Sequence, residues 1–172
     1  YPLLKDWLSE NNSIKGYLLL YNEGVLANLL EALMYHKEGC EAAGDIVVEL
    51  VDYCHRKLTY LMGVTPPSYP ADKEELKKKI LQDTEETGTA QQVESINMSC
   101  AICCLSITRF LTDHIDALPL AVTARILDTY DMLMVLCPLL EIKPWQTDGA
   151  DGEHRRFLQG HWAKVSEPEV RK

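Results

Sequence analysis

Residues 22–61 read NEGVLANLLEALMYHKEGCEAAGDIVVELVDYCHRKLTYL, and this stretch decides the fold class. Its apolar residues recur at intervals of three and four, which is the spacing of one face of an α-helix. The spacing predicts a helix over 22–38 that stops at Gly39, and a second helix over 41–61. The expected core positions are Val25, Leu26, Leu29, Leu30, Leu33 and Met34 on the first helix and Ile46, Val47, Leu50, Val51, Cys54, Leu58 and Leu61 on the second.

Further helices are expected after a proline-rich connection. Three prolines in residues 63–70 cannot continue the preceding helix, and Asp72 with Glu75 fits the reciprocal cap that opens a new one. From 93 to 114 apolar residues advance in alternating steps of three and four, which predicts a central helix. Its stripe consists of Val93, Ile96, Cys100, Cys103, Ile107, Phe110 and His114, widened by Cys104, Leu105 and Leu111.

Proline also divides the last third of the chain. Pro119 suits the first position of a helix that runs to Asp128, and Asp131 can cap the next helix. Pro138 lacks the N–H that would bond to the carbonyl of Met134, so we predict a break in the helix there. The helical pattern then ends at the Pro-Trp pair 144–145.

The C-terminal stretch carries a weaker pattern. Residues 146–153, QTDGADGE, predict an exposed loop. The tail over 157–165 can form a small β-hairpin around Gln159-Gly160, although a two-stranded ribbon is marginal alone. The C-terminal β-hairpin is therefore the one strand element that the sequence suggests.

The predicted fold class is all-α, as a helical repeat array of the armadillo/HEAT type. The phrases NLLEALM (28–34) and PLLEI (138–142) are the only sign of a repeat. We expect 1–172 to be a single helical-repeat domain and, because it opens with Tyr1-Pro2, a fragment of a longer chain. Its expected parts are N-terminal helices over 1–62, a Pro-rich connection over 63–71, central helices over 72–145, and a loop and hairpin tail over 146–172.

Composition and charge argue against two classes of partner. The chain has 17 Lys and Arg against 26 Asp and Glu, a net charge of −9, so we expect no nucleic acid. Its longest apolar runs, 100–105 and 132–140, are far shorter than the roughly 20 residues of a membrane-spanning helix, so we expect no membrane. The six cysteines lie mostly in helical patterns, which predicts a reduced, intracellular protein.

No group of residues predicts a metal site. His36, Cys40, Cys54 and His55 are suitable zinc ligands by type. However, 14 residues separate the two cysteines, which is about 21 Å along one helix, too far for one ion. The CxxC motif within 100–104 has no second ligand pair and is interpreted as small core residues.

No group of residues predicts catalysis either. Asp113-His114 has Thr108 and Thr112 nearby, but the chain contains no glycine elbow, no HExxH motif and no Gly-rich phosphate loop. We therefore expect no enzyme activity and no cofactor in this chain.

A basic and aromatic cluster, Tyr53-Cys54-His55-Arg56-Lys57, is more informative because the rest of the protein is acidic. We expect much of it to be exposed, as a patch for a protein partner. Alternatively, Arg56 and Lys57 complement the negative end of their helix and pair with Asp52 or Glu49. Two tryptophans at loop edges are either packing anchors or partner contacts. The candidate partner-binding residues are Tyr53, His55, Arg56, Lys57, Trp145 and Trp162.

The stretch over 28–61 resembles the central part of the zinc finger MYND domain-containing proteins of the axonemal dynein arm assembly factor family. The most specific phrase is DYCHRKLT (52–59). Other phrases occur in the same order: LLE, HKE and C-E before it, then RFLTD, R-IL-T, LLE and PW, and F-G-W-V in the tail. The resemblance covers most of 17–165, and only 65–92 carries no phrase.

The resemblance implies a non-enzymatic adaptor for the preassembly of dynein arms of motile cilia. The implied partners are a leucine-rich-repeat dynein assembly factor, an FKBP-type immunophilin and a heat-shock chaperone, with dynein intermediate or heavy chains as clients. The implied location is the cytoplasm, with centriolar satellites and the apical cytoplasm near basal bodies. The family's zinc-binding MYND finger is not among these 172 residues, so no zinc ligand is carried over.

Two functions of different kinds are therefore expected. The first is a scaffold that presents its helical surface to dynein chains and co-chaperones. The alternative is a structural helical domain that stabilises or self-associates the full protein, while recognition resides in the zinc finger. Binding by the isolated chain separates the two.

Overall fold

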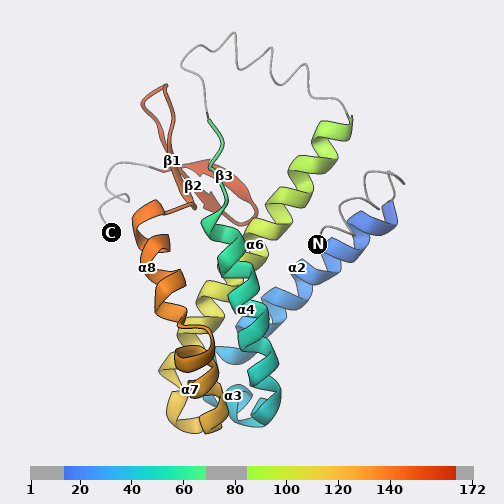
Figure 1. The fold of residues 1–172 in the computed structure, drawn as a ribbon. Coiled ribbons are helices and arrows are strands. Elements are labelled where there is room, and N and C mark those ends of the chain that lie inside the picture. The colour runs from blue at the N-terminus through green and yellow to red at the C-terminus, as the bar shows by residue number, and fades with distance from the viewer. Residues whose placement is uncertain (1–13, 69–84, 166–172) are drawn as a thin grey trace. The chain divides into compact units, whose positions relative to one another are not determined.

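The structure, a computed structural model, describes residues 14–68 and 85–165, which are mostly helical with one small antiparallel sheet (Figure 1). The predicted class is confirmed at this coarse level, while the armadillo/HEAT-type repeat stays a prediction. The predicted cap at Asp72 and Glu75 lies outside the described residues. The helical elements are α2 (Ile14–Met34), α3 (Lys37–Ala43), η1 (Gly44–Ile46), α4 (Val47–Met62), α6 (Glu85–Asp113), η2 (Ile115–Ala117), α7 (Leu120–Ala124), η3 (Arg125–Thr129) and α8 (Met132–Ile142).

The chain divides into two compact units, where the sequence pattern predicted one domain. We call Gly24–Thr65 together with Met98–Pro144 the helical unit. We call Tyr1–Glu23, Pro66–Asn97 and Trp145–Lys172 the sheet unit. Both units are assembled from segments that are far apart in the sequence.

In the helical unit, α4 packs against α8 and α7. The predicted core face of this helix is confirmed at six of its seven positions. Ile46, the seventh, is 72% exposed because it belongs to η1, a 3₁₀ turn. Such a turn rotates about 120° per residue instead of about 100°, so the α-helical spacing does not extend into it. The six buried positions are Val47, Leu50, Val51, Cys54, Leu58 and Leu61.

The predicted central helix is confirmed by the burial of α6. Its one buried polar side chain within Met98–Asp113, Thr108, donates a hydrogen bond to the carbonyl of Cys104 at 2.8 Å, so the hydroxyl is satisfied. Phe110 is half-buried and meets the Tyr35 ring edge to face at 5.3 Å between ring centres. The buried apolar residues of this stretch are Met98, Cys100, Ala101, Cys103, Cys104, Ile107 and Leu111.

The expectation for the first helix was wrong about which face is buried. Val25, Leu26, Leu29 and Leu33 were expected in the core, but each is 46% to 57% exposed. Met34 is buried as expected, and Ala27, which was not expected in the core, is buried at 1% exposure. Because α2 is apolar around most of its circumference, the spacing of its apolar residues could not show which side packs.

Gly39 was expected to end a helix but lies inside α3, which begins at Lys37. The preceding helix ends at Met34. A Cβ atom at Gly39 would lie 2.2 Å from the carbonyl oxygen of Leu33. Glycine therefore permits the close approach of α3 to the last turn of α2.

A left-handed residue joins the last two helices of this unit. Pro119 directly precedes α7, which continues into the π-helical turn η3. Asp131 precedes α8 as predicted, but with φ of 40° and no hydrogen bond from its side chain to the cap. Its main-chain carbonyl instead accepts a hydrogen bond from the N–H of Met134 at 2.8 Å. The predicted side-chain cap was therefore wrong.

The predicted break at Pro138 was also wrong, because α8 continues through it to Ile142. Val135 and Leu139, on either side of the proline, are 7% and 1% exposed. Their burial holds the helix together despite the missing hydrogen bond. Lys143, with φ of 46°, ends the helix just before Pro144, as expected.

The sheet unit contains a three-stranded antiparallel sheet in the order β1-β2-β3, formed by β1 (Gln146–Asp148), β2 (His154–Leu158) and β3 (His161–Lys164). The predicted hairpin is confirmed, with Leu158 opposite His161. Gln159 and Gly160 have φ of 50° and 82°, as in a two-residue type I′ turn. The first three residues of the predicted loop over 146–153 form β1 instead, which supplies the third strand that a short ribbon needs.

In the described part of the chain one helical stretch, Gln91–Asp113, is long enough and apolar enough to span a membrane, judged by length and composition alone. Of its most apolar window, 44% is buried within the structure, and the core helix of a water-soluble protein meets the same measures. The count of uninterrupted apolar runs did not find this stretch because serine and threonine residues interrupt it.

Candidate partner-binding surfaces

The predicted basic and aromatic cluster lies on α4, in the helical unit, and only part of it is exposed. Arg56 is exposed, Tyr53 and His55 are half-buried, and Lys57 is buried at 4% exposure. The expectation that much of the cluster is exposed was therefore wrong for Lys57. We call Tyr53, His55, Arg56 and Lys57 the α4 cluster.

Lys57 is buried because of its position on the helix. It follows Cys54 by three residues and precedes Leu61 by four, and both of these are buried. Its ammonium nitrogen lies 5.7 Å from the centre of the Tyr53 ring, which is within the range of a cation–π contact. Arg56 therefore carries the exposed positive charge of the α4 cluster.

His55 joins a second set of residues that the sequence did not point to. Its ring stacks on that of Tyr130 with 4.0 Å between ring centres and 13° between ring planes. The Arg125 guanidinium lies 6.0 Å from the centre of the same tyrosine ring. Tyr130 follows η3, so the π-helical turn and the residue after it supply both of these partners.

The charge of Asp52 is balanced by Arg125. Their Oδ1 and Nε atoms lie 3.5 Å apart, and both side chains are about one third exposed or less, at 27% and 35%. The sequence interpretation had offered Asp52 as a partner of Arg56 or Lys57. Arg125 is distant in the sequence, so linear spacing carried no signal for this ion pair.

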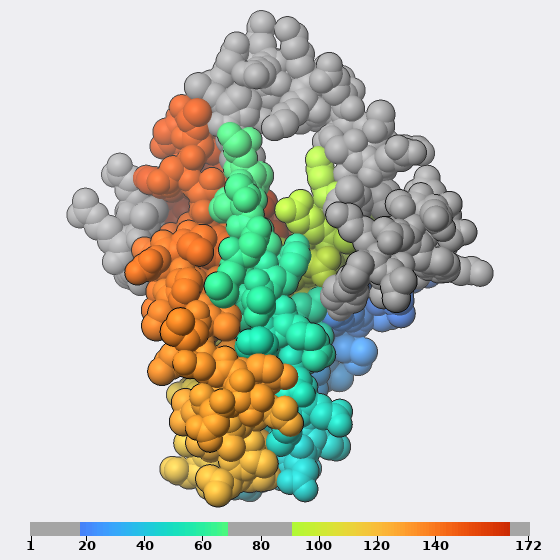
Figure 2. Space-filling view, viewed as in Figure 1, coloured from blue at the N-terminus to red at the C-terminus, as the bar shows by residue number. Residues whose placement is uncertain are grey.

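Figure 2 shows α4 and α8 side by side on one face of the molecule. The exposed apolar residues of α8 include Leu133, Met134, Leu140 and Ile142, at 50% to 68% exposure. Cys137 is also exposed on this helix. The surface of the helical unit therefore combines the α4 cluster with an apolar part on α8.

A second exposed apolar surface lies on α2. We call Val25, Leu26, Leu29 and Leu33 the α2 apolar face. The sequence did carry a signal for it, because α2 has more apolar residues than one buried face can accommodate.

Five of the six thiols of the helical unit, all except that of the exposed Cys137, are core groups. The Cys103 thiol donates a hydrogen bond to Asn28 Oδ1 at 3.2 Å. Burial, and then a hydrogen bond with Glu31, raises the pKa of Cys103 to about 12. A hydrogen bond with Cys54, and then burial, raises the pKa of Cys104 far above its ordinary value. The interpretation of 100–104 as core is confirmed, since Cys100, Cys103 and Cys104 are all buried.

No set of three or more metal-ligating side chains comes together among the residues that the structure describes. His36 and Cys40 lie at α3 and Cys54 and His55 on α4, where Cys54 interacts with Cys104 and His55 stacks on Tyr130.

The two candidate tryptophans, Trp145 and Trp162, belong to the sheet unit, whereas the α4 cluster belongs to the helical unit. Both are half-buried. Trp162 on β3 lies opposite Phe157 on β2, and their rings meet edge to face at 5.6 Å. The main-chain carbonyl of Trp145 accepts a hydrogen bond from the N–H of Phe157 at 2.9 Å. The ring contact favours the role of packing anchor for Trp162, whereas the hydrogen bond of Trp145 involves only its main chain.

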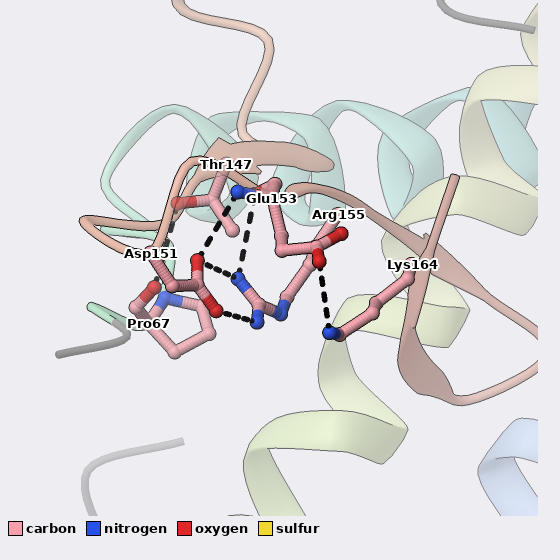
Figure 3. A network of polar contacts seen from close by, with 6 residues as sticks. All are labelled: Pro67, Thr147, Asp151, Glu153, Arg155 and Lys164. Carbon is pink, nitrogen blue, oxygen red and sulfur yellow. Dashed lines mark hydrogen bonds and ion pairs between the residues drawn. The ribbon is translucent and has the colours of Figure 1, made fainter. Parts of the chain in front are cut away.

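A polar network closes the turn between β1 and β2 in the same unit (Figure 3). The buried guanidinium of Arg155 bonds to both carboxylate oxygens of Asp151, one of them at 2.9 Å. Arg155 thereby holds the pKa of Asp151 well below its ordinary value. A Cβ atom at Gly149 would meet Asp151 Oδ1 and Arg155 Nη1, so a larger residue there would displace one side chain of this ion pair. Lys164 and Glu153 add an ion pair at 3.3 Å.

The chain is similar in sequence to curated proteins, one of which is described below. The chain is 26% identical over 154 residues, 88% of its length, to the zinc finger MYND domain-containing protein 10 homolog of Drosophila melanogaster. The aligned part is 33% of that protein, so the chain spans about a third of the length of this relative. No family model matches the chain, and no solved structure matches it.

Proposed function

We propose that this chain is a non-enzymatic scaffold or adaptor domain of a cytoplasmic factor for the preassembly of axonemal dynein arms in motile cilia. The observation that supports the proposal is the similarity to a MYND domain-containing relative over 88% of the chain. The DYCHRKLT phrase at 52–59, which lies on α4, supports it further, because it is the most specific part of the resemblance. Because the chain spans about a third of that relative, the partners of the whole protein are part of the proposal.

The proposed clients are dynein intermediate or heavy chains. The proposed proteins that act together with this chain are a heat-shock chaperone, an FKBP-type immunophilin and a leucine-rich-repeat assembly factor. The proposed location is the cytoplasm, including centriolar satellites and the apical cytoplasm near basal bodies. Neither nucleic acid nor a membrane is a proposed partner. Zinc is proposed only for a MYND finger outside these 172 residues.

The proposed mechanism is the presentation of a rigid helical surface. A buried seam of α4 packs on its neighbours, while Arg56 stays exposed and His55 is held in place by its stack on Tyr130. Rigid side chains lose little conformational entropy on binding, which favours recognition at such a position. Arg56 is therefore the residue of the α4 cluster that best tests the proposal.

The test is a pull-down of dynein intermediate chain and chaperones by the 172-residue chain. We expect Arg56→Glu to reduce capture severalfold, because it reverses the exposed charge of the α4 cluster. Arg109→Glu is the matched control, since Arg109 is an exposed arginine on α6 that pairs with Asp113 across one helical turn. Equal loss for both variants would remove the α4 cluster as the binding surface, and no capture by the unaltered chain would contradict the scaffold proposal.

The second candidate function is a structural helical domain that stabilises or self-associates the full protein. The α2 apolar face favours it, because exposed apolar surface of this kind marks an interaction site. This candidate predicts that the chain associates with itself and captures no dynein chain.

A further inference from the structure

The exposed side of α8 carries an apolar stripe. Leu133, Cys137 and Leu140 follow each other in steps of four and three, so they lie on one side of the helix. Met134 lies next to them on the same exposed side. The side chains of Leu133, Met134 and Leu140 are 59% to 68% exposed, and Cys137 is exposed as well. We call these four residues the α8 stripe.

The opposite side of α8 is already used inside the chain. Met132, Val135 and Leu139 are buried at 7% exposure or less, and the helix packs against α4. The α8 stripe is therefore a second apolar side of a helix whose first side is packed. It exposes apolar surface on the order of 400 Å², which is a usual size for a functional patch on a monomer and fits a weak, short-lived contact.

Three exposed acidic residues accompany the α8 stripe. Asp128 and Asp131 precede the helix, and Glu141 lies on its exposed side, seven residues after Met134. Lys143, just after the helix, is the one basic residue in 128–143. Among the described residues none of the three acids lies in an ion pair. We call Asp128, Asp131 and Glu141 the acidic rim.

The cations of the helical unit do little to balance the acidic rim. Lys57 is buried, which leaves Arg56 and Lys143 as the exposed cations of this unit that lie outside the ion pairs of the described residues. The chain as a whole carries a net charge of −9, so the field around the α8 stripe is negative. The other three cations are in ion pairs at 3.5 to 3.6 Å, namely Lys37 with Glu41, Arg109 with Asp113 and Arg125 with Asp52.

This charge selects the kind of partner that the surface fits. A second copy of the chain would bring the same acidic rim and another net charge of −9 against it, and an anionic membrane would be repelled in the same way. A helix of a partner protein that has apolar residues in steps of three and four can pack along the α8 stripe. Lysine or arginine residues at the edges of that helix would then lie opposite the acidic rim.

We propose that the α8 stripe is a docking site for a cationic amphipathic helix of a partner protein, which the acidic rim attracts and orients. The apolar contact supplies most of the affinity, and the charges supply the preference for a cationic partner. The proposal does not rest on the dynein-arm function, because Arg56, which tests that function, belongs neither to the α8 stripe nor to the acidic rim.

The probe is a dye-labelled helical peptide of about 14 residues that consists of leucine and lysine, with its leucines in steps of three and four. Fluorescence anisotropy measures its binding to the 172-residue chain at up to about 200 µM. We expect micromolar affinity that falls severalfold between about 50 and about 500 mM salt, because salt screens the attraction. A peptide with the same leucines and with glutamate in place of lysine should bind at least about tenfold more weakly.

One pair of variants tests the apolar contact. Leu140→Gln should weaken binding of the leucine–lysine peptide at least about fivefold, because it removes apolar area from the α8 stripe. Leu26→Gln on α2 is the matched control, since Leu26 is 57% exposed and Leu140 is 66% exposed. The control should leave the affinity unchanged.

A second pair of variants tests the acidic rim. Asp128→Asn, Asp131→Asn and Glu141→Gln together should weaken binding severalfold and flatten its salt dependence. Asparagine suits position 131, where φ is 40°. The matched control removes the same number of exposed acids elsewhere in the helical unit and should change the affinity much less. It combines Glu38→Gln, Asp45→Asn and Asp116→Asn.

Circular dichroism should show the same helix content for all variants, so that a loss of binding reports the surface and not the fold. No binding of the leucine–lysine peptide overturns the proposal, and so does equal weakening by both members of either pair. Self-association that Leu140→Gln abolishes would identify a second copy as the occupant and would overturn it as well. Arg56→Glu should not weaken peptide binding, so failure of the dynein pull-down is distinguishable from failure of this proposal.

Discussion

Lys57 lies on the buried seam of α4, at 4% exposure, with its ammonium 5.7 Å from the centre of the Tyr53 ring. Removing an ammonium group from water costs several kcal/mol unless other groups compensate it. A desolvated cation–π contact stabilises the buried ammonium by roughly 2 kcal/mol, and burial of the four methylene groups of lysine adds further stabilisation. Lys57 is therefore part of the structure of the helical unit, and Arg56 beside it remains available to a partner.

Gly39 permits a close contact that any larger residue would disrupt. We predict that Gly39→Ala lowers the free energy of unfolding by about 1–2 kcal/mol, because the clash outweighs the better helix propensity of alanine. The new Cβ atom would lie 2.2 Å from the Leu33 carbonyl oxygen. Urea unfolding followed by circular dichroism measures the change.

Gly63→Ala is the matched control for that prediction. A Cβ atom at Gly63 would have its nearest neighbour, the Tyr60 carbonyl oxygen, at 3.5 Å, which is an ordinary contact. The control should change the free energy of unfolding by less than about 0.5 kcal/mol. Equal stability of the Gly39→Ala variant and the unaltered chain would show that α3 does not approach α2 as described.

At the scale of elements, packing overrides local backbone preferences in α8. Pro138 is the seventh residue of this helix, where it cannot donate a hydrogen bond to Met134. The helix nevertheless continues, because Val135 and Leu139 are buried on its packed side. Met134 is 68% exposed, so water can reach the turn that loses its bond.

We predict that Pro138→Ala raises the free energy of unfolding by about 1–2 kcal/mol, because it restores the missing bond and relieves the clash of the ring. The gain stays below the full cost of about 3 kcal/mol because proline also restricts the unfolded chain. Thermal and urea unfolding measure it. Cys137→Ala, an exposed neighbour on the same helix, is the control and should have a much smaller effect.

At the scale of the whole molecule, the distribution of thiols reports on the integrity of the helical unit. All six cysteines belong to this unit, and only Cys137 is exposed. Burial raises the pKa of Cys40, and the pKa values of Cys103 and Cys104 are raised as well. A thiolate is the reactive form of cysteine. These thiols are therefore protected from modification because reagents do not reach them and because they stay protonated.

We predict that an aromatic disulfide reagent at about pH 8 modifies one thiol rapidly in the folded chain and the other five only as fast as the chain unfolds. In denaturant all six should react together. Cys137→Ser should abolish the rapid phase. A rapid phase that persists in this variant would mean that the core of the helical unit is open.

The fold was predictable where only one arrangement could bury the apolar residues. Six of the seven positions of the predicted α4 face are buried. In the predicted stripe of α6, Cys100, Cys103, Cys104, Ile107 and Leu111 are buried, whereas Val93, Ile96, Leu105, Phe110 and His114 are half-buried. The turn at Gln159-Gly160 was predictable because few residue pairs suit a two-residue hairpin. In α2 several sides are apolar, so the spacing of its apolar residues fits more than one orientation of the helix. The orientation that we inferred was wrong.

The candidate surface, too, was predictable only where it depends on residues that are close in the sequence. Sequence alone located the α4 cluster and its phrase, because residue types that are close in the chain are also close on one helical turn. The stack of His55 on Tyr130, the ion pair of Asp52 with Arg125 and the burial of Lys57 depend on neighbours that are distant in sequence.

The amino-acid sequence by itself determined that this protein is built from helices, where its central helices lie, and which family it resembles. These properties depend on local periodicity and local residue identity. Only the tertiary structure decided which side of α2 is exposed, that Lys57 is buried and that three strands form a sheet. The physical reason is that burial is shared between surfaces that meet only after folding, and a linear pattern does not contain the identity of the second surface.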